Sequence, residues 1–82
     1  MANVKGYTRD NEGNVTAVKL TVPVLVMAFG HRFRSKTVDI GNLVAVPGAG
    51  GTYHPKVVSI DAARGTFTDD IGHVHRITAM LE

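Results

Sequence analysis

Hydrophobic and polar residues alternate along the segment 17–22, with a valine or leucine at every second position from Val18. A period of two is typical of a strand that buries one face. After Pro23 the alternation stops, and residues 24–29 are apolar at every position. A strand that is apolar on both faces needs a cover on both. We therefore expect a second layer, or a second copy of the chain, to cover one face.

Turn-forming residues (Gly, Asn, Asp and Pro) punctuate the rest of the chain about every ten residues, and no segment carries a helix-length apolar stripe with caps. Pro23 has no N–H to donate, so it marks a bulge, an edge or a strand start, and we place a break between strands there. The pattern predicts strands over residues 3–8, 15–22, 24–29, 43–46, 53–60, 66–68 and 73–81, with a final helical turn in the last of these. We therefore expect an all-β fold, a small antiparallel β-barrel or sandwich of about five to seven short strands.

The segment that follows residues 24–29 has two interpretations. Gly30-His31 forms a tight turn, or the strand continues through it. In the second case side chains would alternate between two faces. One face would then carry Phe29, His31 and Phe33, and the other Arg32, Arg34 and Lys36.

Length and composition limit the ways in which this fold can be stabilised. The chain has 82 residues, of which 44% are hydrophobic and 20% charged, and its net charge is +2. These values are typical of one folded domain, here residues 1–82, with a single small core. No cysteine is present, which excludes disulfides and thiolate metal sites. Oligomerisation is a common reinforcement for a domain of this size.

The apolar segments are shorter than the ~20 residues that a helix needs to span a bilayer. The N-terminal residues also lack an apolar core of signal-peptide length. We expect a soluble protein, in the cytoplasm or within an assembled particle, that is not secreted and has no membrane partner.

The second half of the chain consists of short apolar segments separated by glycine turns. Residues 40–46 lead into a glycine-rich loop, residues 53–61 into a turn that ends at Gly65, and residues 66–72 into a further turn. Over residues 40–77 this spacing resembles Tudor- and KOW-type small barrels of Src-homology-3-like architecture. Tudor domains that bind methylated side chains use aromatic cages, and only Tyr53 and Phe67 stand near cage positions. The resemblance therefore implies a fold, without a ligand.

Four histidines are the candidate metal ligands. His73 and His75 are two residues apart and point to the same side of a strand, which suits chelation. A third ligand would be His54, Asp69 or Asp70. The alternative is a row of solvent-exposed histidines, or a pH-sensitive contact. His31 is the fourth histidine. We expect no metal and no cofactor, with His73 and His75 as weak candidates only.

The remaining patterns do not favour catalysis. Asp69 and Asp70 are adjacent turn formers, whereas paired catalytic carboxylates face each other across a substrate. The loop 47–51 is glycine-rich but lacks the Lys-Ser/Thr of a phosphate-binding loop, and no helix follows it. We expect no enzymatic activity and no small-molecule substrate.

A basic-aromatic patch is the clearest binding candidate. Its cations could follow a phosphate backbone while its aromatic rings stack on bases. The alternative is a solvated edge strand whose cations prevent aggregation. The patch consists of His31, Arg32, Phe33, Arg34, Lys36 and Tyr53.

Three functions follow from these patterns. The first is a self-associating structural or assembly protein, for example a virion accessory, which forms a homo-oligomer or larger assembly. Its predicted self-association residues are Val24, Leu25, Met27 and Phe29. The second is a small nucleic-acid-binding barrel that uses the basic-aromatic patch. The third is an adaptor or inhibitor that adds a strand to the sheet of another protein.

Overall fold

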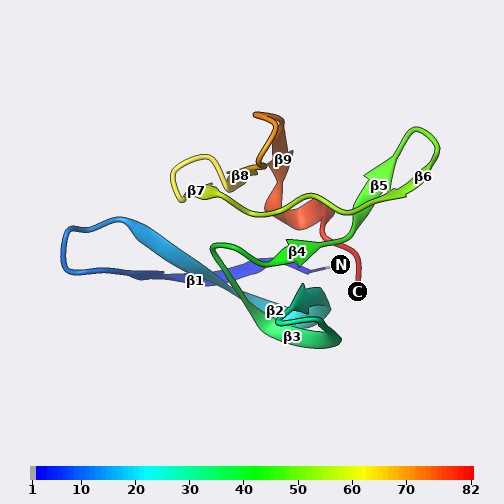
Figure 1. Ribbon diagram of the computed structural model, residues 1–82. Coiled ribbons are helices and arrows are strands. Elements are labelled where there is room, and N and C mark those ends of the chain that lie inside the picture. The colour runs from blue at the N-terminus through cyan, green and yellow to red at the C-terminus, as the bar shows by residue number, and fades with distance from the viewer. Residues whose placement is uncertain (1) are drawn as a thin grey trace.

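The computed structural model describes residues 2–82, so Met1, the first residue of the predicted domain, lies outside the described part. The fold is all-β, as the sequence predicts (Figure 1). Its elements are β1 (Val4–Arg9), β2 (Val15–Ala28), β3 (His31–Asp39), β4 (Leu43–Val44), β5 (Val46–Gly48), β6 (Gly51–Tyr53), β7 (Ser59–Asp61), β8 (Thr66–Thr68), β9 (Val74–Arg76) and the 3₁₀ turn η1 (Ile77–Ala79).

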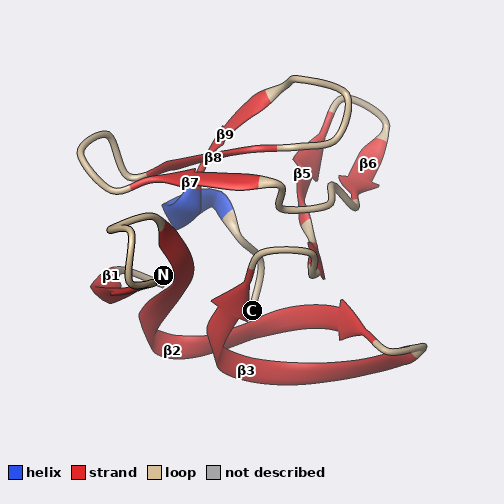
Figure 2. Ribbon diagram, turned by 60° about the vertical axis from the view of Figure 1, so that its left-hand side comes forward, coloured by secondary structure: helices blue, strands red, loops and turns tan. Residues whose placement is uncertain are grey.

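These strands form three antiparallel sheets. The largest has the order β1-β2-β3, with β4 also paired to β2, while β5-β6 and β7-β8-β9 form two smaller sheets. Figure 2 shows β2 and β3 as a long pair at the bottom, with the β7-β8-β9 sheet above them. The sheets do not close into a barrel; the arrangement is that of small layers around one core.

Residues 2–82 contain nine strands, more than the five to seven expected, because β3 is a further strand and two predicted strands are divided. The expected strand 43–46 is divided between β4 and β5. The expected strand 53–60 is divided into the end of β6 and the start of β7, with an irregular segment between them. Pro55 lies in this segment and offers the ladder no N–H. Its carbonyl instead accepts a hydrogen bond from the N–H of Val44 at 3.1 Å. The predicted helical turn near the C-terminus is present as η1.

The predicted break at Pro23 is wrong, because β2 runs without interruption through it, whereas the alternative of a bulge at this proline is confirmed. The proline is accommodated by a register shift. Lys19 pairs with Thr37 and Val24 with Ser35, so four residues of β2 lie against one residue of β3. Such a bulge leaves unpaired backbone on the longer strand, which is where a residue without an N–H fits.

One face of β2 forms the centre of the core. Leu20, Val24 and Val26 are all buried on it. Phe67 of β8 closes the core from the opposite layer and is 1% exposed. Several other fully buried side chains of this cluster are aliphatic: Val18, Val38, Val44, Val57 and Ile77.

Candidate functional site

The hairpin that joins β2 to β3 has an unusual turn. Ala28 pairs with His31, so Phe29 and Gly30 are its two central residues. Both have positive φ, 54° and 73°, as a type I′ turn requires. Gly30 adopts this conformation without strain, but a phenylalanine does so at a cost. Phe29 is also 94% exposed, so its ring gains almost no burial within this chain.

The outer face of the same hairpin is apolar and only partly covered. Leu25 and Met27 are half-buried, in contrast to the fully buried Val24 and Val26 on the inner face. Met27 pairs with Leu43 on one side and with Arg32 on the other. Directly opposed residues share a face of the sheet, so these three side chains form a row across β4, β2 and β3.

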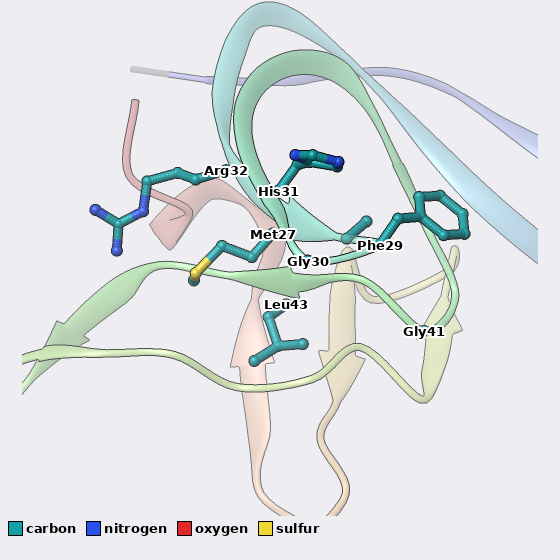
Figure 3. A pocket seen from close by; sticks show the side chains of 8 residues that line it. Met27, Phe29, Gly30, His31, Arg32, Gly41 and Leu43 are labelled. Carbon is teal, nitrogen blue, oxygen red and sulfur yellow. The ribbon is translucent and has the colours of Figure 1, made fainter.

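Figure 3 shows this end of the molecule. Phe29 points away from Met27 and Arg32, which lie on the other side of the hairpin. A shallow pocket of about 410 Å³ lies here. Its lining residues come from the hairpin end and from the chain that leads into β4: Met27, Ala28, Phe29, Gly30, His31, Arg32, Gly41 and Leu43.

Cations accompany these apolar side chains. Arg32, Arg34 and Lys36 are all exposed on β3, and no acidic residue occurs between positions 24 and 36. Phe33 opposes Val26 and therefore lies on the inner face, yet it is 41% exposed because the hairpin extends beyond the core. We call Leu25, Met27, Phe29, Arg32, Phe33 and Arg34 the hairpin surface.

The structure corrects the predicted residue sets in two places. Val24 is buried in the chain's own core and is not available to a partner. Tyr53 lies on β6 and lines a different pocket from that of the hairpin. The turn at Phe29-Gly30 excludes a strand that continues through residue 30, although His31 and Phe33 do share one face of β3 and Arg32 and Arg34 the other.

A second polar cluster centres on Asp69, whose side chain is fully buried. One carboxylate oxygen accepts hydrogen bonds from His75 Nε2 at 2.8 Å and from the Tyr53 hydroxyl at 3.2 Å. The other oxygen accepts from the backbone N–H groups of Ile71 and His73. His75 also stacks on Phe67, with ring centroids 5.0 Å apart. Asp69 thus anchors the turn between β8 and β9 to β6.

These contacts shift the pKa values of Asp69 and Tyr53. Burial raises the pKa of Asp69, but the hydrogen bonds from His75, the backbone of His73 and Ile71, and Tyr53 outweigh it and lower the pKa from 3.8 to about 2. Burial, together with the charge of Asp69, raises the pKa of Tyr53 above its ordinary value of 10.0. Asp69 is therefore a permanent carboxylate at neutral pH.

The predicted histidine pair borders a groove beneath the glycine-rich loop. His73 and His75 line it together with Tyr53, Ile71 and the loop 47–52. Among residues 2–82, no group of three or more His, Asp or Glu side chains is placed to hold a metal ion. The sequence identified Asp69 as a turn former, but its link to Tyr53, 16 residues away, leaves no local signal.

Comparisons with known proteins add no relative: no protein-family description, curated protein or solved structure matches the chain significantly. Within residues 2–82 the one helical element is the three-residue turn η1, and no helix is long and apolar enough to cross a membrane.

Proposed function

We propose that this protein is a non-enzymatic structural protein that assembles with copies of itself through the hairpin surface. The observation that supports the proposal is the exposed ring of Phe29, held at the hairpin turn in a left-handed backbone conformation. A turn of this type favours Asn-Gly. Retaining a strained and solvated phenylalanine there lowers stability in the monomer, and strain of this kind is concentrated at functional positions.

The partly covered outer face supports the same proposal. Leu25 and Met27 remain half-buried after the chain has folded. A domain of this size buries only roughly 60–65% of its unfolded surface, so an interface that completes this burial would add stability that the monomer lacks. Aromatic residues, methionine and arginine are also the types enriched at protein interfaces, and the hairpin surface contains all three.

The test is the solution mass, measured by size exclusion with light scattering over a range of protein concentrations. The wild-type protein is expected at a multiple of 8.8 kDa, and Phe29→Asn at 8.8 kDa. Ile71→Asn is the matched control, since Ile71 is an exposed apolar residue on the β8-β9 turn. It should keep the wild-type mass. A wild-type protein that is monomeric at every concentration would refute the proposal.

A second candidate is a nucleic-acid-binding domain, supported by the three exposed cations and by Phe33 on the same hairpin. This function requires binding of a single-stranded oligonucleotide that weakens steeply with salt. The double variant Arg32→Glu/Arg34→Glu should abolish such binding, because both charges are reversed. Oligonucleotide binding by a monomeric wild-type protein would favour this candidate over assembly, and capture of one stoichiometric foreign protein would favour an adaptor.

A further inference from the structure

We infer that assembly is head-to-tail, with the Phe29 ring of one copy entering a pocket with apolar walls and polar edges at the start of β2 in the next copy. The inference rests on the proposed assembly function and specifies its geometry. A head-to-tail contact uses two different surfaces of each chain, and repetition generates a ring or an open filament.

The receiving pocket has a volume of about 390 Å³, within the range of pockets that hold ligands. Ile40 and Val58 line it and are 37% and 44% exposed. Val15 and Ile60 add further apolar surface, while Asn14, Thr16 and Ser59 provide polar edges. An aromatic side chain that enters an apolar pocket is a typical anchor of a protein interface.

Charge favours this pairing over contact between two identical surfaces. Residues 24–36 carry three fixed cations and no acid. A two-fold interface built on this surface would bring the arginines of both copies together, and like charges at an interface are unfavourable. Among the described residues that line the receiving pocket, Asp10 is the one that carries a charge. Its carboxylate has the sign that complements Arg32 and Arg34.

The location of the two surfaces permits repetition. The pocket is formed where β2 begins, whereas Phe29 follows the end of the same strand. In Figure 2 the start of β2 lies at the left and the far end of the β2-β3 pair at the lower right. One chain can therefore present its hairpin to a second copy while its own pocket receives a third.

The test uses two variants, each of which disables one surface. Phe29→Asn removes the ring, and Val58→Arg places a long cation in the pocket. Both residues are exposed, so both variants should fold, which far-UV circular dichroism verifies. Val74→Arg is the matched control, because Val74 is an exposed valine that does not line this pocket. Ile40→Arg is a second variant that replaces Val58→Arg if the latter does not fold.

The expected result is that Phe29→Asn and Val58→Arg, each measured alone, have a mass of about 8.8 kDa. An equimolar mixture should give a species of about twice that mass, because the Val58→Arg chain still carries the ring and the Phe29→Asn chain the pocket. Val74→Arg should assemble as the wild type does.

Other outcomes separate this inference from the proposed function. If Val58→Arg and Ile40→Arg assemble normally while Phe29→Asn does not, this pocket does not receive the Phe29 ring. The proposed assembly through the hairpin surface would still stand. A mixture that remains monomeric would overturn the head-to-tail geometry. A monomeric wild-type protein would overturn both.

Discussion

Replacing Phe29 with asparagine should stabilise the fold while it removes the assembly contact. The backbone cost of the left-handed conformation is about 1–2 kcal/mol for an L-residue, and asparagine is the residue that this turn position favours. Only the remaining 6% of the Phe29 surface is buried. This fraction of a side chain of about 200 Å² is about 12 Å². At about 25 cal/mol per Å², removing the ring therefore costs roughly 0.3 kcal/mol of hydrophobic stabilisation.

Asparagine should recover about half of the backbone cost, so the free energy of unfolding should rise by about 0.2–0.7 kcal/mol. In a domain of this size, 1 kcal/mol corresponds to about 4–8 °C in Tm, so the Tm should rise by about 1–6 °C. Phe29→Ala is the matched comparison, since it removes the ring but keeps the strained conformation. Its Tm should not exceed that of the wild type.

The assay is thermal unfolding followed by far-UV circular dichroism. It must be performed at concentrations where all variants are monomeric, because assembly raises the apparent stability of the wild type. A fall in Tm of more than a few degrees for Phe29→Asn would refute the reasoning. Such a fall would mean that the Phe29 ring packs within its own chain.

Two further predictions concern the buried carboxylate and the two faces of β2. The pKa of Asp69 falls from 3.8 to about 2 on folding, so the folded state binds fewer protons than the unfolded state between these pH values. The stability that this difference contributes is present above about pH 4 and is lost as the pH falls towards 2. Asp69→Asn should therefore flatten the fall in Tm over this range, with exposed Asp70→Asn as control. Val26→Asn should destabilise the fold by about 2 kcal/mol or more, since it buries an amide in the core. Met27→Gln should cost less than about 1 kcal/mol of stability but impair assembly. Urea unfolding measures the stability of each variant, and the solution mass measures its assembly.

Strands and turns can be predicted from this sequence where the local residue pattern agrees with the burial that the fold imposes. Alternation before Pro23 located β2, and the turns at Gly13 and Gly65 have the expected positive φ. The sequence could not decide which face of residues 24–29 is buried, because both faces are apolar. The register with β3 and β4 makes that choice, and it places Val24 and Val26 inward.

The hairpin end, the receiving pocket and the Asp69 cluster are harder to predict, because tertiary structure brings their residues together. Phenylalanine is not a turn-forming residue, so in the sequence only Gly30 indicates the hairpin end, and the apolar pattern extends the expected strand to Phe29. The receiving pocket joins Asp10, Ile40 and Val58, which are far apart in the sequence and share no motif. The link between Tyr53, Asp69 and His75 also becomes visible only after folding.

The bulge in β2 has a consequence for how the protein opens. The first half of β2 pairs with β1 and the end of β3, and the second half with β4 and the start of β3. Between Lys19 and Val24 the ladder to β3 is interrupted. Local opening spreads through contiguous cooperative units, so the second half, with its hairpin, can exchange amide protons separately from the first. Head-to-tail assembly would then protect the hairpin amides in one step and those around the receiving pocket at the start of β2 in another, and hydrogen exchange would locate the two surfaces without any variant.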